Sequence, residues 1–232
     1  MHRRLVLTAL ALSLPVSLAA CGGSAKKAED PTTALSKAKT TLDTAKAVTI
    51  DLKSSSAVPT GHNGVSAAKG TGLIDATTPK FKGKVSAVVN GTPATVEMVG
   101  IGEKTWMSFF SPKLTPIDMA DLGAPDPALL FKPDTGLASM LGKASGATMG
   151  TEQRYGKEVL QTYTAKVPGQ VVVDLLHLSD AKETLDAEFE IEPTSGQLRV
   201  AKLTGVYYEG EPKSTYTVVL TDYGKTIDIA QP

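Results

Sequence analysis

The chain has 232 residues with 24 basic and 24 acidic side chains, so its formal net charge is zero. This balance argues against nucleic acid as a partner, because phosphate binding requires a basic surplus. Hydrophobic residues make up 41% of the chain but aromatic residues only 5%, which argues against broad stacking platforms for sugars. The length suits one sizeable core or at most two small ones.

The first twenty residues have the layout of an export signal. His2, Arg3 and Arg4 give a positively charged start, and residues 5–18 form an apolar run that is short for a bilayer span. We therefore expect residues 1–20 to be a signal peptide that is absent from the mature protein.

Cys21 is the only cysteine in the chain, so it cannot form an internal disulfide. It follows Leu18-Ala19-Ala20, and this tetrapeptide resembles the cleavage box of bacterial lipoproteins, in which the cysteine receives a thioether-linked diacylglycerol. The alternative is an ordinary secretory signal followed by a chance cysteine. We expect Cys21 to be lipidated and to anchor the protein at the extracytoplasmic face of the cell membrane. Residues 21–33 are mostly small, polar or charged, which is typical of a flexible tether.

The folded domain is expected over residues 34–232, and its first element is a helix. Apolar residues recur there at three- and four-residue intervals, which predicts an amphipathic helix over 33–47 that is capped by Thr32 or Thr33. The residues of this apolar stripe are Leu35, Ala38, Leu42 and Ala45.

From residue 48 the pattern changes to the period of two that is typical of strands. Strands are predicted over 48–57 and 65–74. The strongest local signal lies in 83–101, where two β-rich runs flank Asn90-Gly91, a pair that adopts positive φ readily at a tight hairpin. A strand over 104–110 continues the predicted sheet.

Five prolines between residues 111 and 133 disfavour both helix and strand ladder. We expect this stretch to be irregular, with a short turn of helix near 117–122. A short helix is predicted over 135–141, after the capping sequence Pro133-Asp134-Thr135.

The remainder of the chain is mostly strand. A strand over 157–167 is followed by a short buried helix over 170–178. The next strand alternates between a dry and a wet face. Its apolar side is Leu185, Ala187, Phe189 and Ile191, and its acidic side is Asp186, Glu188, Glu190 and Glu192. A strand over 215–221 and a final short strand over 226–229 complete an α+β fold, in which helices cover one face of a single antiparallel sheet.

The residues needed for catalysis are sparse. His62 lies in a Gly/Asn-rich turn and His177 lies among leucines, and neither has a nearby nucleophile and orienting group. Closely spaced Cys and His ligands for zinc are missing, and so is a calcium loop. We therefore expect neither enzyme activity nor a metal or other cofactor.

The dry face of the predicted sheet is the remaining candidate for a functional site. The predicted helices are few and short, so they could leave an apolar cavity beside the sheet. Small or flexible residues on the dry face of the hairpin would wall it: Val85, Ala87, Val89, Ala94, Val96, Met98 and Gly100. The alternative is that these residues pack directly against the first helix, and the pattern alone favours that packing.

The sequence DPALLFKPDTGLASML over 126–141, the cleavage box at Cys21 and the helix-then-strand order resemble the LppX/LprA/LprF/LprG lipoproteins of mycobacteria and other actinobacteria. The resemblance implies a curved antiparallel half-barrel, wrapped on a few helices, with an apolar cavity for multi-acylated lipids or glycolipids. It also implies that residues 85–89 and 96–98 wall this cavity and that the proline-rich stretch lies near its mouth. Residues 119–123 and the region after 146 do not follow the family pattern.

Two functions are compatible with these features. The first is a carrier that shelters the acyl chains of an acylated lipid or glycolipid and passes them across the envelope, held to the membrane by its N-terminal anchor. The second is an interaction module that scaffolds or regulates a membrane transporter through the acidic strand face, with Glu188 and Glu190, or through the proline-rich stretch.

Overall fold

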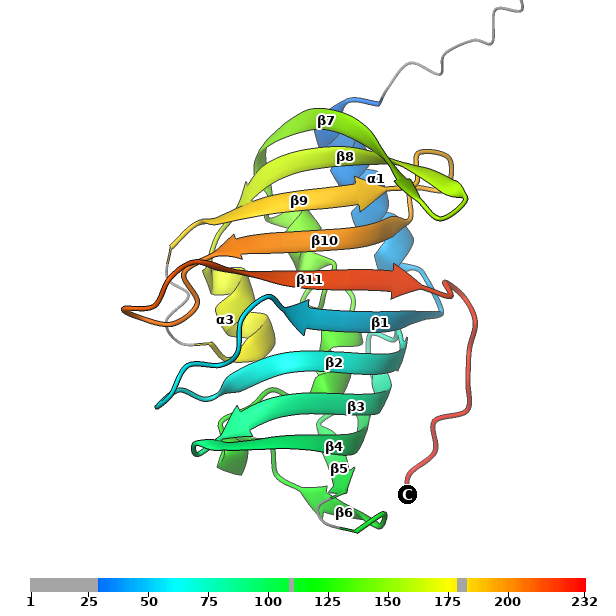
Figure 1. The fold of residues 1–232 in the computed structure, drawn as a ribbon. Helices are drawn as coiled ribbons and strands as arrows, with labels where there is room; N and C mark the ends of the chain where they lie inside the picture. The colour runs from blue at the N-terminus through cyan, green and yellow to red at the C-terminus, as the bar shows by residue number, and fades with distance from the viewer. Residues whose placement is uncertain (1–28, 109–110, 179–182) are drawn as a thin grey trace, which may run out of the picture.

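The computed structural model describes residues 29–108, 111–178 and 183–232, so the expected signal peptide and Cys21 lie outside the described residues. Within these ranges eleven strands form one antiparallel sheet in the order β6-β5-β4-β3-β2-β1-β11-β10-β9-β8-β7 (Figure 1). The sheet is curved and the helices lie behind it in this view, on its inner face. The predicted fold class, a curved antiparallel half-barrel on a few helices, is confirmed.

The elements have the following bounds. The strands are β1 (Ala47–Ser54), β2 (Gly64–Leu73), β3 (Lys80–Val89), β4 (Thr92–Ile101), β5 (Lys104–Ser108), β6 (Leu114–Ile117), β7 (Ser145–Tyr155), β8 (Glu158–Val167), β9 (Leu185–Ile191), β10 (Leu198–Gly205) and β11 (Ser214–Thr221). The α-helices in the described part are α1 (Pro31–Asp43), α2 (Ser139–Gly142) and α3 (Gln170–Leu176), and the 3₁₀ helices are η1 (Ala120–Leu122) and η2 (Pro127–Phe131).

The sheet consists of two meanders joined at its centre. Strands β1 to β6 pair in sequence order on one side, and β7 to β11 do so on the other. The two meanders meet where β1 pairs with β11, with Ile50 opposite Leu220. The first and last strands of the chain therefore close the middle of the sheet, and β6 and β7 form its two edges.

The predicted hairpin between β3 and β4 is confirmed. Asn90 and Gly91 both have positive φ, 49° and 74°, as a two-residue turn of type I′ requires. The ladder pairs Val89 with Thr92 and Val85 with Val96.

Helix α1 begins and ends earlier than predicted. Asp30 caps it by accepting a hydrogen bond of 3.1 Å from the Thr33 backbone N–H, and Pro31 occupies the first turn. Proline suits this position because its missing N–H would have no helical partner there. The helix stops at Asp43 because Ala47 already pairs in β1. The predicted apolar stripe holds as far as Leu42, since Ala34, Leu35, Ala38 and Leu42 are buried.

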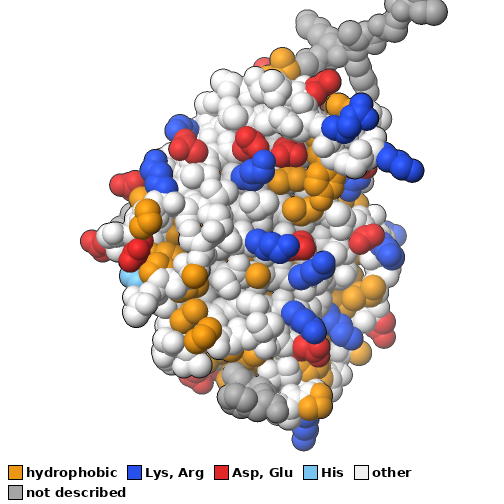
Figure 2. Space-filling view, viewed as in Figure 1, with side chains coloured by type: hydrophobic (Ala, Val, Ile, Leu, Met, Phe, Trp, Pro, Cys, Tyr) orange, Lys and Arg blue, Asp and Glu red, His pale blue; other side chains and the backbone are white. Residues whose placement is uncertain are grey.

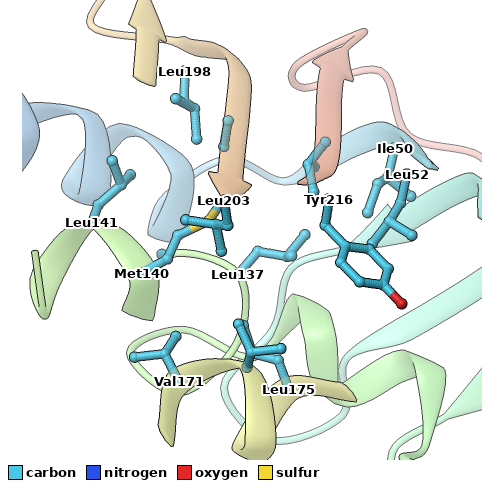
Figure 3. Close-up of a cluster of buried hydrophobic side chains, with 14 of the residues drawn as sticks. Ile50, Leu52, Leu137, Met140, Leu141, Val171, Leu175, Leu198, Leu203 and Tyr216 are labelled. Carbon is cyan, nitrogen blue, oxygen red and sulfur yellow. The ribbon is translucent and has the colours of Figure 1, made fainter. Parts of the chain in front are cut away.

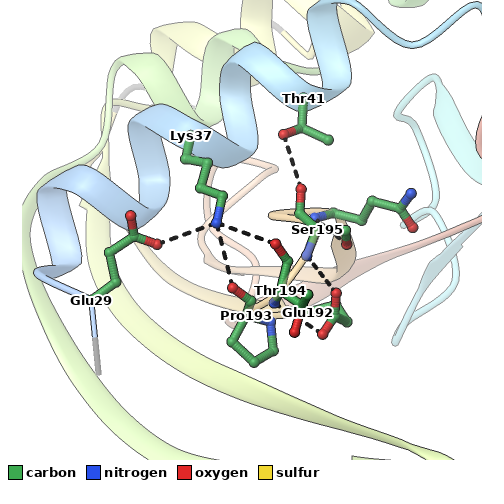
Figure 4. Close-up of polar contacts among 8 residues, drawn as sticks. Glu29, Lys37, Thr41, Glu192, Pro193, Thr194 and Ser195 are labelled. Carbon is green, nitrogen blue, oxygen red and sulfur yellow. Dashed lines mark hydrogen bonds and ion pairs between the residues drawn. The ribbon is translucent and has the colours of Figure 1, made fainter. Parts of the chain in front are cut away.

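The turn between β9 and β10 fixes α1 against the sheet (Figure 4). The Lys37 ammonium donates to the carbonyl oxygens of Pro193 and Thr194, at 3.4 and 3.5 Å. The Thr41 hydroxyl donates to the Ser195 carbonyl at 3.4 Å. These contacts join residues more than 150 positions apart in the chain.

Apolar side chains from all three α-helices and the sheet meet in one buried cluster (Figure 3). Its labelled members are Ile50, Leu52, Leu137, Met140, Leu141, Val171, Leu175, Leu198, Leu203 and Tyr216. They come from β1, α2 and the turn before it, α3, β10 and β11. The helices thus fill the interior behind the middle of the sheet and its C-terminal half.

Several predicted boundaries in the second half of the chain are wrong. The proline-rich stretch contains β6, and Pro116 lies opposite Trp106 of β5; an edge strand tolerates proline because one side of it has no ladder to maintain. The predicted turn of helix near 117–122 is the short η1. Helix α2 starts only at Ser139, without a side-chain cap. Residues 226–229 form no strand, because Ile229 packs across β4 and β5 instead of pairing along a sheet edge.

Candidate functional site

The inner face of the N-terminal half of the sheet is hollow. A cavity of about 270 Å³ lies there, walled by β1 to β5, the proline-rich stretch and the end of α3. Its lining residues are Ile50, Leu52, Val65, Ala68, Phe81, Val85, Ala87, Val89, Thr92, Ala94, Val96, Met98, Met107, Met119, Leu122, Ala124, Pro125, Pro127, Leu130 and Leu176. None of these residues comes from β7 to β11, so the cavity belongs to one meander.

Of the hairpin residues named in the sequence analysis, all but Gly100 lie on this lining, and Gly100 packs against Ala128 instead. Alternate residues of a strand share a face, and the ladder places Val85 opposite Val96 and Ala87 opposite Ala94. The hairpin therefore contributes two adjacent rows of small side chains to one wall. That these residues contact a lipid stays a prediction.

Exposure changes along the hairpin. At one end of the cavity Phe81, Met98 and Met107 are buried, with exposed fractions of 1%, 3% and 4%. Toward the hairpin tip Val89 is half-buried and Thr92 is exposed. The cavity is therefore closed at the Phe81 end and opens toward the turn at Asn90 and Gly91.

Two stacked aromatic rings form the closed end. The Phe81 and Phe131 rings are nearly parallel, 8° apart, with their centroids at 5.8 Å. Gly72 of β2 permits this stack, because a Cβ added at Gly72 would overlap the Phe131 ring. Phe81 lines the cavity, whereas Phe131 lies behind it and does not.

The proline-rich stretch supplies the wall opposite the hairpin. Met119, Leu122, Ala124, Pro125, Pro127 and Leu130 come from it, and Leu176 comes from α3. Periodicity could not identify these residues, because their backbone follows neither a helical nor a strand repeat. The available signal was the combination of many prolines with many apolar residues, and the family resemblance placed this stretch near the mouth.

The side chains that line the cavity are almost all apolar. Thr92 is its one polar side chain, and none of the lining residues is charged. Among the described residues, no group of three His, Cys, Asp or Glu side chains could hold a metal ion. An apolar, uncharged wall favours hydrocarbon, since polar groups lose hydrogen bonds to water there.

The acidic face of β9 does not form a free negative surface. Lys202 forms ion pairs with Glu188 at 2.6 Å and with Glu190 at 3.0 Å, and Lys166 pairs with Asp186. Figure 2 shows acidic and basic side chains intermixed over this outer side of the sheet. The face is neutralised within the protein, which weakens its use as a docking surface for a basic partner.

In the part of the chain that the structure describes, every helix is too short or too polar to span a bilayer. The fold and the cavity define a half-barrel protein in which one half of the sheet packs on helices and the other encloses an apolar pocket.

The chain belongs to the LppX_LprAFG lipoprotein family, whose family model matches residues 30–229. Solved structures share the fold. LprF from Mycobacterium bovis has a TM-score of 0.72 at 10% identity, over 88% of this chain and 99% of that chain. LppX from Mycobacterium tuberculosis has a TM-score of 0.61 at 12% identity, over 87% and 100%. No curated protein sequence matches the chain.

Proposed function

We propose that the protein is a lipid carrier of the cell envelope, which shelters the acyl chains of a lipid or glycolipid in the cavity and passes the lipid onward. The observation that supports this proposal is an apolar cavity of about 270 Å³, open at one end and lined by uncharged side chains. A lipid stays in a bilayer because exposing its acyl chains to water costs free energy. Enclosing these chains in the cavity offsets that cost. Such a carrier needs no covalent step.

The proposed ligand contacts are Val85, Ala87, Val89, Ala94, Val96 and Met98. In the full chain with Cys21→Ser, we expect lipid to copurify and to be detected by native mass spectrometry. Val85→Trp should abolish this loading, because the indole would fill the half-open part of the cavity. Lys84→Trp is the matched control, since the Lys84 side chain is 68% exposed and pairs with Glu97 outside the cavity.

Circular dichroism should show the same folded signal for both tryptophan variants. Unchanged lipid loading in a folded Val85→Trp variant would show that the cavity is not the lipid site. If the Cys21→Ser chain and both tryptophan variants all purified without lipid, the result would favour the second function, a module that scaffolds or regulates a membrane transporter.

We further propose that Cys21 carries the lipid anchor and that residues 21–33 tether the domain at the extracytoplasmic face of the cell membrane, where a transporter could supply or accept the lipid. The intact mass of protein extracted from membranes tests this anchor. We expect a chain that begins at Cys21 and carries acyl groups, and Cys21→Ala should release the protein from the membrane. An unmodified cysteine would exclude the proposed anchor.

A further inference from the structure

The two edges of the sheet differ in how they are protected against pairing with another chain. Strand β6 has four residues, one of them Pro116, and short edge strands and prolines prevent such pairing. Strand β7 has eleven residues, contains neither proline nor lysine, and is exposed except at Ala147. Its two bulges lie before residue 152, so residues 152–155 pair regularly with β8. The end of β7 is therefore an open and regular edge.

This open edge belongs to a hairpin that projects from the sheet. Strand β8 pairs with β9 only from Gln161 onward, so residues 153–160 extend beyond β9 as two strands (Figure 1). Glu158 accepts a hydrogen bond of 2.5 Å from Arg199, which holds the β8 arm, but Tyr155 and Val159 remain 41% and 39% exposed. Because two strands alone are marginally stable in water, a further strand along β7 would stabilise the hairpin.

The hairpin turn determines which backbone groups of β7 face the open edge. Tyr155 lies opposite Glu158 across the two-residue turn at 156–157. The two residues that close such a turn exchange hydrogen bonds with each other, and this arrangement alternates along the ladder. The backbone N–H and C=O groups of Glu152 and Arg154 therefore point away from β8. A strand added at this edge would bond to these two residues.

The charges of the same two residues favour a second copy of the chain as that strand. When two β7 strands pair antiparallel with Gln153 opposite Gln153, Glu152 of each copy lies opposite Arg154 of the other, and all four residues direct their backbone groups at the partner strand. Sliding one copy by two residues in either direction keeps the backbone pairing. It then places Glu152 opposite Glu152, or Arg154 opposite Arg154, which is destabilising. The edge is thus complementary to itself in the register centred on Gln153.

We propose that two copies of the chain associate through residues 151–155 of β7, antiparallel and centred on Gln153. The two hairpins form a four-stranded unit with an ion pair between Glu152 and Arg154 at each end of the contact. The contact is small, so the association is weak in dilute solution. Anchoring both copies in one membrane raises their effective concentration. The cavity takes no part, since no residue of β7 lines it.

Disulfide cross-linking tests the register. Opposing residues that do not bond to each other have Cα atoms about 4.5 Å apart, which a disulfide can bridge. The full chain with Cys21→Ser and Gln153→Cys, oxidised at high protein concentration, should therefore form a covalent dimer on a non-reducing gel. Tyr155→Cys in the same background is the matched control on the same face of β7. Its two thiols would lie about 14 Å apart, so this variant should remain monomeric.

Exchanging the charges tests the pairing itself. Arg154→Glu, added to the Gln153→Cys chain, places Glu opposite Glu152 and should abolish the covalent dimer. Adding Glu152→Arg as well restores opposite charges in the same register, and the dimer should return. All these positions are exposed, so circular dichroism should show an unchanged fold.

The outcomes separate the parts of the proposal. No covalent dimer of the Gln153→Cys chain would overturn the self-association and leave this edge for a strand of another protein. Equal dimer yields from Gln153→Cys and Tyr155→Cys would indicate random collision and overturn the register. A dimer that persists in Arg154→Glu, or that the double exchange fails to restore, would overturn the role of the ion pairs. Lipid loading of the cavity should be the same in every variant.

Discussion

Glu192 is the residue that organises the turn holding α1 against the sheet. Its carboxylate accepts backbone hydrogen bonds from Thr194 at 3.0 Å and from Ser195 at 2.6 Å. Burial acts to raise its pKa, but hydrogen bonds from Ser195 and Thr194 outweigh burial and lower the pKa to about 2. The ionised carboxylate therefore stabilises the turn whose carbonyl groups bind Lys37 and Thr41.

The lowered pKa of Glu192 predicts a pH-dependent contribution to stability. Because the folded-state pKa lies below the ordinary value of 4.5, this contribution is complete above pH 4.5 and is lost as the pH falls toward 2. Glu192→Gln should cost on the order of 1 to 2 kcal/mol of unfolding free energy at pH 7. The difference from the unsubstituted chain should shrink in urea titrations at progressively lower pH.

Glu211→Gln is the control for this measurement, since Glu211 is exposed in the loop between β10 and β11. Glu211→Gln should leave the free energy of unfolding unchanged both at pH 7 and near pH 2. If Glu192→Gln cost the same free energy near pH 2 as at pH 7, the ionised carboxylate would not be the stabilising species.

At the scale of elements, the C-terminal tail strengthens the cavity wall from outside. After β11 the tail runs along the molecule toward β4 and β5 (Figure 1). Ile229 is 1% exposed and packs with Val99 and Trp106, on the face of those strands opposite the cavity. The Lys80 ammonium donates to the Ile229 carbonyl at 3.0 Å. Ile229 and its carbonyl group thus attach the end of the tail to these strands.

Ile229→Asp should detach the tail. A carboxylate cannot stay in this apolar cluster without a partner, and losing the burial of one isoleucine should cost about 2 kcal/mol. Trp106 is the only tryptophan of the chain and is 7% exposed, so its fluorescence emission should shift to longer wavelength. Ile227→Asp is the matched control, because Ile227 is already 39% exposed. Unchanged Trp106 emission in Ile229→Asp would show that the tail does not shield this ring.

The sequence predicted elements well where one face is dry and the turn chemistry is local. Leu185 and Phe189 of β9 are fully buried as their alternation indicates, and Asn90-Gly91 fixed the hairpin. Strand β7 gave no such signal, because every residue of it except Ala147 is exposed. Its position follows from pairing with β8, which is a tertiary property.

The candidate site was predictable in part for a similar reason. The hairpin wall has a strand period, so its cavity-facing residues could be named in advance. The opposite wall has no period, and residues such as Met119 and Leu130 reach the cavity only through the path of the irregular backbone. The tail also lacks a local pattern, since Ile229 is buried by contacts with strands more than 100 residues earlier.

On the scale of the whole molecule, the two halves of the sheet have different interiors. Helix α1 contacts β7 and α2, and Glu29 forms an ion pair of 3.7 Å with Lys37 of this helix. The chain therefore enters the domain at the β7 end. Eight strand steps separate β7 from β4, about 38 Å along the sheet. Residues 29–33, the described part of the proposed tether, and the cavity therefore lie toward opposite ends of the molecule.

This division predicts a localised response to ligand. Decanoic acid in the cavity should slow amide hydrogen exchange in β3 and β4, whose inner side chains line it, because bound ligand suppresses local opening. Strands β8 to β10 contribute no lining residue and should exchange at unchanged rates. Hydrogen–deuterium exchange mass spectrometry of the full chain with Cys21→Ser, with and without the acid, measures both regions at once. Val85→Trp should abolish the protection, and equal protection of both halves would mean that the sheet responds as one unit and that the hollow half has no separate role.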